Sequence, residues 1–407
     1  IRGAVRFYEG QVDDARHTMM IARTAAAYGA LCANSTRVTG FLREDDRVIG
    51  VVATDLESGE SFEIHAKQVI NAAGVWTDEI QEMVGGRGQF QVRASKGVHL
   101  VVPRNRINSS TGIITRTEKS LLFVIPWGSH WIIGTTDTDW KLDLAHPAAS
   151  KSDIDYILGH VNKLLQDPLD HKDVVGVYAG LRPLLYGESD STSTLSREHA
   201  VSSPVRGLTV IAGGKYTTYR VMAKDAVDSA VHNMERKVPE CVTEKIPLVG
   251  ADGYYGAWNA RQLAADRAGM RVGRMEHLLG RYGTLVGEIL DLIDQNPELG
   301  KPLDNAPDYL RAEAVYAASH EGAQHLDDIL TRRIRVSIEL PDRGEAAAAE
   351  VAALVAPILG WDEQHVSDEI EHYRKRVAAE RESQAQPDDE TADAARLGAP
   401  DVRVGVS

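Results

Sequence analysis

Residues 212–220 read Ala-Gly-Gly-Lys-Tyr-Thr-Thr-Tyr-Arg and join an extended apolar run at 208–212 to a helical stretch at 217–235. Two adjacent glycines let the backbone approach a ligand closely. A helix that begins just after them turns free N–H groups and the positive end of its dipole toward one point. A phosphate or the pyrimidine edge of a flavin suits that point, and a plain strand-to-helix turn is the alternative.

The same residues do not form a nucleotide-binding P-loop. That motif needs a glycine where this chain has Thr209, and a Ser or Thr after the lysine, where it has Tyr216. A second motif, His320-Glu-Gly-Ala-Gln-His325, resembles a zincin sequence but is one residue too long to place both rings on one helix face. We therefore expect neither a P-loop nor a metal site.

Two other segments place glycine and cationic side chains where a packed core would not. Residues 95–99 read Ser-Lys-Gly-Val-His and lead into a valine-rich strand. Residues 179–184 read Ala-Gly-Leu-Arg-Pro-Leu, and Arg197 follows soon after them. With residues 212–220, these segments are the candidate functional site.

Charge and composition exclude several classes of protein. The 407 residues include 45 basic and 59 acidic side chains, a formal charge of −14, which argues against nucleic acid as a partner and against binding to anionic lipid through charge alone. No run of about 18 apolar residues predicts a transmembrane helix. Cys32 and Cys241 form no CxxC pair, which argues against a disulfide framework and fits a reducing cytosol.

The hydrophobic pattern predicts mixed α/β structure over residues 1–245. We expect a helix from Asp13 to Tyr28, strands at 36–42, 47–56, 61–66 and 68–73, and a hairpin at 121–135 with Gly128 in its turn. The run at 68–74 is apolar enough to be buried on both faces. A helix is expected at 152–166, with Ser152 as its N-cap. Residues 246–381 have helical periodicity and predict a separate helical domain, and residues 382–407, with few large apolar side chains, predict a disordered tail.

Seven short motifs, in order, resemble the motif set of FAD-dependent glycerol-3-phosphate dehydrogenases of the aerobic bacterial type. Gln11 replaces an aromatic residue before the first of them. A single motif is a weak signal, but seven in order across about residues 5–235 are strong. The helical segment, with 320–323 and 331–335, resembles the family's C-terminal domain. The motifs occupy 12–16, 96–103, 124–127, 132–137, 180–184, 196–198 and 213–220.

The resemblance implies a fold as well as a function. It implies an FAD-binding, doubly wound α/β domain of the glutathione-reductase/D-amino-acid-oxidase type, interleaved with an antiparallel-sheet substrate domain and followed by a helical domain. The chain starts at Ile1 and contains no strand followed by GxGxxG. We therefore expect the family's N-terminal dinucleotide-binding unit to be missing from this sequence.

The resemblance also implies roles in the oxidation of glycerol 3-phosphate to dihydroxyacetone phosphate. His99 is the candidate base, because an imidazole titrates near pH 6.5 and small shifts bring it into range. Arg182 would stabilise the developing alkoxide, and Arg197 and Lys215 would bind the phosphate. The alternatives are a strand histidine bonded to a carbonyl, for His99, and structural ion pairs, for the cations. Asp137 is expected to be a turn residue without a catalytic role.

The cofactor contacts are carried over from the family in the same way. Ala73, Gly74 and Trp76 match the stretch near the ribityl chain and pyrophosphate, and Val38 matches the position whose backbone faces adenine. The flavin contacts would come from Gly213, Gly214, Lys215, Tyr216, Thr217 and Thr218.

Three functions are open at this point. The first is an FAD-linked glycerol-3-phosphate dehydrogenase that passes electrons to a quinone-type acceptor, is located in the cytoplasm with peripheral contact to the inner face of the cell membrane, and has a homodimer as one oligomeric option. The second is an amine or amino-acid oxidase of the same fold. The third is a cofactor-free fragment that acts as a binding module. Three cations favour a phosphate dianion over a single carboxylate, and so favour the first.

Overall fold

The chain divides into two compact units. The computed structural model describes residues 3–85, 91–118, 120–186, 198–232, 234 and 237–403. The first unit comprises Ile1–Asn34, Ile246–Ser337 and Gly344–Tyr373, and the second comprises Ser35–Lys245, Ile338–Arg343 and Arg374–Ser407. This division differs from the predicted domains 1–245 and 246–381, because residues 1–34 group with the helical segment and residues 374–403 group with the sheets. Within the described ranges, no helix has the length and apolar character needed to cross a bilayer.

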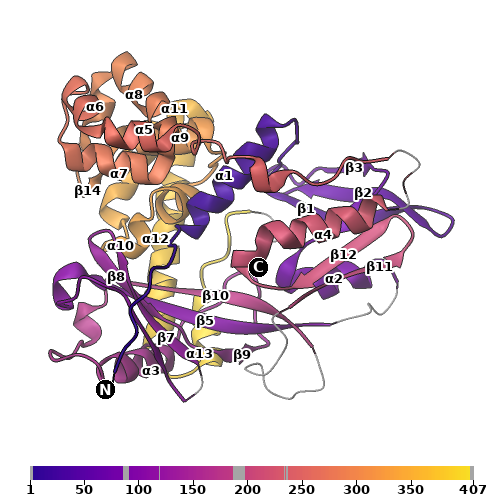
Figure 1. Ribbon diagram of the computed structural model, residues 1–407, viewed down its shortest axis with the longest axis horizontal. Coiled ribbons are helices and arrows are strands. Elements are labelled where there is room, and N and C mark those ends of the chain that lie inside the picture. The colour runs from indigo at the N-terminus through magenta and orange to yellow at the C-terminus, as the bar shows by residue number, and fades with distance from the viewer. Residues whose placement is uncertain are drawn as a thin grey trace. The chain divides into compact units, whose positions relative to one another are not determined.

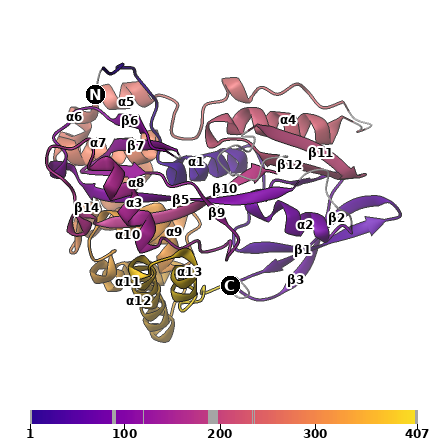
Figure 2. The same cartoon turned by 90° about the horizontal axis from the view of Figure 1, so that it is seen from below.

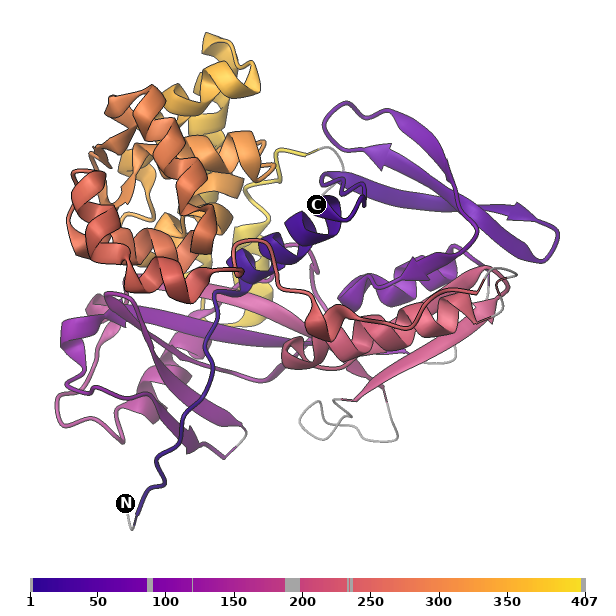
Figure 3. The same ribbon diagram turned by 45° about the horizontal axis from the view of Figure 1, so that its top comes forward.

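Residues 246–337 of the first unit are mostly helical (Figure 3, orange). Helix α1 (Asp14–Ala27) is capped by Asp13, whose side chain accepts hydrogen bonds from the N–H groups of Ala15 and Arg16. The apolar core of the first unit is built around Met275, Leu278 and Ile289. The other elements are α5 (Tyr254–Asn259), α6 (Arg261–Arg267), α7 (Val272–Tyr282), α8 (Val286–Gln295), β13 (Pro302–Leu303), β14 (Ala306–Leu310), α9 (Arg311–His320) and α11 (Ala348–Leu359).

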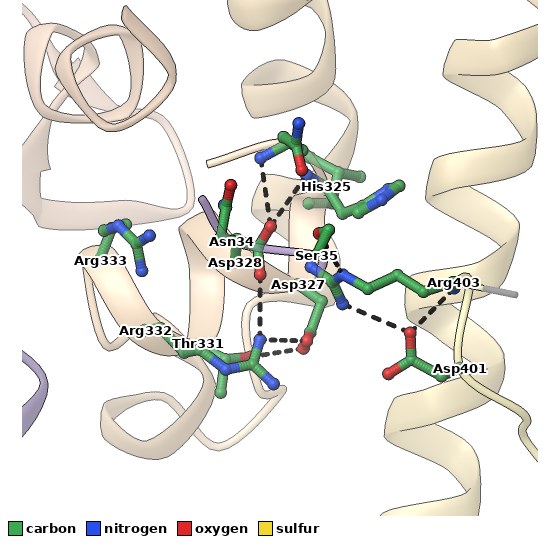
Figure 4. Close-up of polar contacts among 12 residues, drawn as sticks. Asn34, Ser35, His325, Asp327, Asp328, Thr331, Arg332, Arg333, Asp401 and Arg403 are labelled. Atoms are coloured by element: carbon green, nitrogen blue, oxygen red, sulfur yellow. Dashed lines mark hydrogen bonds and ion pairs between the residues drawn. The ribbon is translucent and has the colours of Figure 1, made fainter. Parts of the chain in front are cut away.

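Polar contacts in the first unit account for the motifs at 320–325 and 331–335. The Arg16 guanidinium bonds to the buried Glu321 carboxylate at 2.6 Å. His325 Nδ1 lies 2.7 Å from Glu369 Oε1. Arg332 bonds to Asp327 and Asp328 (Figure 4). In the part of the chain that the structure describes, no group of three or more His, Cys, Asp or Glu side chains is placed to hold a metal ion.

The largest sheet of the second unit has six strands. Its order is β10-β5-β8-β7-β6, with β9 paired to β5, and every pair is antiparallel. The predicted hairpin is confirmed, with Gly128 at φ 51° between β7 and β8. The strands are β5 (Val92–Pro103), β6 (Ile113–Arg116), β7 (Leu121–Trp127), β8 (His130–Gly134), β9 (Thr138–Trp140) and β10 (Gly176–Leu185).

Helix α3 (Lys151–Val161) covers one face of this sheet (Figure 2). Ile154 and Ile157 pack there with Val98 and Leu100 of β5. The predicted N-cap was wrong: the cap is Ser150, not Ser152, and Ser150 forms a capping box with Asp153. The helix begins two residues earlier because Asp153 stands at the position from which a carboxylate reaches back to the cap N–H.

Two three-stranded sheets complete the second unit. One is an antiparallel meander of β1 (Thr36–Glu44), β2 (Arg47–Asp55) and β3 (Ser61–His65). The other has the order β11 (His199–Val205), β12 (Leu208–Gly213), β4 (Val69–Asn71), with β12 and β4 parallel, and α4 (Tyr219–Val231) lies along it (Figure 1). The expectation that both faces of residues 68–74 are buried was wrong, since Ile70 is 39% exposed.

The predicted disordered tail was also wrong for the residues described. Helices α12 (Glu363–Ala385) and α13 (Asp389–Arg396) span most of residues 382–403. Ala392 is buried with Ala94, Trp140 and Ala148, and Asp389 bonds to the buried Lys96 ammonium at 2.5 Å. The composition was misleading because this segment is held by a small side chain and an ion pair rather than by large apolar residues.

Candidate active site

A cavity of about 760 Å³ opens between β4, β10, β12 and α4 in the second unit. It brings together segments that lie about thirty residues apart, since Arg182 comes from β10 and Lys215 follows β12. Its wall is mostly apolar and includes Leu181, Pro183 and Met222. Gly213, Gly214 and Tyr216 also line it. Arg182 and Lys215 therefore line one cavity, whereas no residue of the candidate segment 95–99 is among those that line it.

The turn after β12 is glycine because the fold requires it. Gly213 and Gly214 have φ values of 77° and 81°, in the left-handed region that side chains disfavour. A Cβ on Gly213 would lie 2.5 Å from the Glu198 carbonyl oxygen, and one on Gly214 would collide with Met222. Turn geometry thus explains the two glycines, and the case for a ligand rests on the cavity that they line.

His99 lies on β5, next to β10. Its ring stacks on Tyr178 of β10 with centroids 5.0 Å apart. Gly134 makes room for it, because a Cβ at that position would collide with the imidazole. Burial, and then the nearby charge of Arg182, lower the pKa of His99 to about 4. This lowering favours the neutral imidazole, which is the form that can accept a proton.

Arg182 is held by the connection between β8 and β9. Its Nη2 donates to Thr135 Oγ1 at 3.0 Å and its Nη1 donates to the Thr136 carbonyl at 3.3 Å. Its Nη1 also lies 3.9 Å from Asp137 Oδ1. The side chain keeps 28% of its surface exposed, so the guanidinium is both anchored and accessible.

The other predicted site residues are more scattered. Ala73, Gly74 and Trp76 follow β4, where Thr77 Oγ1 donates to the Gly74 carbonyl at 2.7 Å. Val38 pairs with Ala53 in the meander. Among the described residues, the cavity lining includes none of these four, nor Thr217 or Thr218. Arg197 lies outside the described residues.

Sequence reasoning missed three side chains that contact the candidate site. They are Tyr178, which stacks on His99, Thr135, which accepts a bond from Arg182, and Asp137. The strand periodicity does predict that Ser95, Gly97 and His99 share one face of β5, since side chains alternate between the two faces of a strand. It does not predict which residues of other strands lie next to them. The pairing of β5 with β10, which sets Arg182 opposite Ser95, is visible only in the structure.

We expect the pH dependence of substrate oxidation to report His99. Protonation below about pH 4 would remove its capacity to accept a proton, so kcat/KM should fall as pH drops through that value rather than near 6.5. His99→Asn should abolish this limb. His65→Asn, at an exposed histidine of β3, is the matched control. If the acidic limb of kcat/KM were the same in His99→Asn and in the parent, His99 would not be the catalytic base.

The residues around the cavity fit a flavin and a phosphate. Apolar side chains suit a planar ring, and a guanidinium and an ammonium suit negative charge on a reduced flavin or on a phosphate. A family model described as FAD dependent oxidoreductase matches residues 1–220, and one described as the C-terminal domain of alpha-glycerophosphate oxidase matches residues 241–366. The protein is an FAD-dependent oxidoreductase with a C-terminal helical domain, so the predicted fold class and cofactor are confirmed.

Individual relatives show which FAD-dependent oxidoreductases this chain resembles. Glycerol-3-phosphate dehydrogenase 2 of Mycobacterium tuberculosis is 58% identical over 99% of this chain and 69% of its own length, and glycerol-3-phosphate dehydrogenase of Mycobacterium leprae is equally similar over the same shares. The crystal structure of glycerol-3-phosphate dehydrogenase from Bacillus halodurans complexed with FAD is similar with a TM-score of 0.78, at 28% identity over 90% of this chain and 73% of that one. The chain belongs to the FAD-dependent glycerol-3-phosphate dehydrogenase family.

Proposed function

We propose that this protein oxidises glycerol 3-phosphate to dihydroxyacetone phosphate with FAD as its electron acceptor. The observation that carries the proposal is that Arg182 and Lys215, from separate elements, line one cavity, and that the charge of Arg182 acts on His99. Two cations at one cavity suit a phosphate dianion and a developing alkoxide. The names of the related enzymes support the same substrate.

Bound FAD would supply the acceptor for a hydride that leaves C2 of the substrate for flavin N5. The residues of the chain would manage charge and position. His99 Nε2 or Nδ1 would accept the proton of the C2 hydroxyl, so that loss of a hydride and a proton leaves a carbonyl. Arg182 would stabilise the negative charge that develops on that oxygen. Lys215 and Arg197 would bind the phosphate and thereby orient C2.

The FAD contacts proposed for this chain fall into two groups. Gly213, Gly214 and residues 215–218 would face the ring from the turn between β12 and α4. Ala73, Gly74 and Trp76 would approach the ribityl chain and pyrophosphate, and the backbone of Val38 would approach adenine. These assignments rest on the family resemblance, and for Gly213, Gly214, Lys215 and Tyr216 also on their place in the cavity wall.

Anaerobic mixing separates this function from its alternatives. We expect glycerol 3-phosphate to bleach the flavin absorbance of the holoenzyme, and glycine or another amino acid to leave it unchanged. Bleaching by the amino acid alone would indicate an amine oxidase of the same fold. A folded, colourless protein that takes up no added FAD would instead favour a binding module.

The acceptor that reoxidises the reduced FAD is a separate part of the proposal. We propose a quinone-type acceptor, which would require peripheral contact with a membrane surface. The substrate-reduced holoenzyme should then reduce a short-chain quinone analogue in the absence of oxygen. Persistence of the reduced flavin in the presence of the quinone would contradict this part and leave the substrate assignment intact.

Replacing Lys215 with alanine should mainly weaken substrate binding. Loss of a charge-assisted bond to phosphate costs about 1.5–3 kcal/mol, so KM should rise by roughly one to two orders of magnitude while kcat changes less. Lys224→Ala is the control, because Lys224 on α4 pairs with Asp228 at the surface. An unchanged KM in Lys215→Ala would remove Lys215 from the phosphate site.

A further inference from the structure

The guanidinium of Arg182 occupies a niche built by the connection between β8 and β9 and by β5. Its two hydrogen bonds go to Thr135 Oγ1 and to the Thr136 carbonyl, in the connection between β8 and β9. Thr135 Oγ1 in turn donates to the Thr136 carbonyl at 3.0 Å, so the two acceptors are linked. These contacts fix the plane of the guanidinium relative to β5.

Gly97 provides the space for this niche. A Cβ at position 97 would lie 2.5 Å from Arg182 Nη2 and 2.6 Å from Thr135 Oγ1. Any side chain there would therefore displace the guanidinium or the threonine hydroxyl. Gly97 pairs with Gly180 across the strands, and Arg182, two residues beyond Gly180, reaches back toward it. The glycine of the Lys-Gly-x-His motif thus has a packing reason that is specific to Arg182.

Asp137 supplies the negative charge of the niche. Its side chain is only 3% exposed, and its Oδ1 lies 3.9 Å from Arg182 Nη1. The Ser95 hydroxyl donates to the same carboxylate oxygen, and Ser95 stands opposite Arg182 in the β5–β10 register. A buried carboxylate next to a guanidinium favours one orientation of the cation, because the charge is weakly screened at such a site.

We propose that Asp137 is a positioning residue that holds Arg182 in place through this niche, with Ser95 and Thr135 as its supports. The proposal deepens the proposed function and rests on it, since it assigns to Asp137 the alignment of the side chain that faces the substrate oxygen. It replaces the expectation that Asp137 is only a turn residue.

A double-mutant cycle tests the proposal. Asp137→Asn keeps the size of the side chain and removes its charge. In the holoenzyme we expect it to slow substrate-driven flavin bleaching by about tenfold to a hundredfold, since misplacement of a catalytic group by about 1 Å has effects of this size. The apparent dissociation constant of glycerol 3-phosphate should change much less. Asp139→Asn is the control, because Asp139, on the neighbouring β9, forms an ion pair with Arg93 of β5.

The Arg182→Lys background separates positioning from general damage. Asp137→Asn should cause little further loss in that background, because the group that it positions is already altered. Equal losses in both backgrounds would overturn the proposal. Ser95→Ala is a milder second variant for the case in which Asp137→Asn fails to fold, and it should show the same non-additivity.

A structural readout makes the test independent of the substrate. In a crystal structure of the Asp137→Asn or Ser95→Ala holoenzyme, we expect the guanidinium to have left the Thr136 carbonyl. An unmoved guanidinium would overturn the proposal even if the substrate were different. If the parent flavin is not bleached by glycerol 3-phosphate but the guanidinium moves, the proposed function fails and the positioning role stands.

Discussion

Replacing Arg182 with alanine is expected to lower kcat by about 10²–10³-fold, which is typical of removing one preorganised donor from a developing oxyanion. Arg182 is anchored by Thr135 and Thr136 but retains an accessible surface in the cavity. Its loss would leave the developing charge on the substrate oxygen without a cation at the cavity wall. Steady-state kinetics with glycerol 3-phosphate and pre-steady-state flavin bleaching both measure this effect.

The Arg182 prediction has a matched control in the same sheet. Arg93 lies in β5, the strand that pairs with β10, and it forms an ion pair with Asp139 at 2.5 Å near the surface. Because surface ion pairs contribute little, Arg93→Ala should keep a kcat close to that of the parent. A parent-like kcat in Arg182→Ala, or an equal loss in both variants, would contradict the role proposed for Arg182.

Replacing Lys96 with methionine is expected to destabilise the sheet unit by about 3–5 kcal/mol, the cost of breaking a buried ion pair by removing one partner. The Lys96 ammonium is fully buried and bonds to Asp153 at 2.7 Å, to Asp389 at 2.5 Å and to the Ala148 carbonyl at 3.1 Å. The variant would leave the Asp153 carboxylate buried without its cation. Urea unfolding measures the change in the free energy of unfolding. Hydrogen exchange of the β5 amides then measures the loss of protection in that strand.

An exposed lysine nearby provides the comparison for Lys96. Lys151 pairs with Asp155 at 2.5 Å on the surface of α3, and Lys151→Ala should cost less than about 1 kcal/mol. Asp389→Asn tests the C-terminal partner and should destabilise β5 by an intermediate amount. Unchanged protection of β5 in both Lys96→Met and Asp389→Asn would show that α13 does not support this strand.

The hairpin and the tail show where sequence reasoning succeeds and where it fails. The hairpin at 121–135 depends on local signals, alternating apolar residues and a glycine in the turn, and the structure confirms it. Helix α13, by contrast, is bonded at Asp389 to Lys96, which is almost three hundred positions away in the chain. The local amino-acid composition cannot predict an interaction with a residue so far away in the sequence.

The candidate site shows the same division. The residue types at 95–99, 179–184 and 212–220 indicated chemistry before any fold was known, and Arg182 and Lys215 do line one cavity. The low pKa of His99 and the niche around Arg182 were not predictable, because both arise from β5, β8 and β10 lying side by side. The ion pair of Asp137 with Arg182 was not predictable for the same reason.

The sequence by itself determined the kinds of element, the family resemblance and the side chains able to carry charge to a ligand, because periodicity, glycine placement and ordered motifs are properties of neighbouring residues. Only the tertiary structure decided which charges are buried together, as with Lys96 and Asp153, and which charge stands beside a given cation, as with Asp137 and Arg182. Electrostatic interaction depends on distance through space and on burial. Neither quantity can be obtained from positions along the chain.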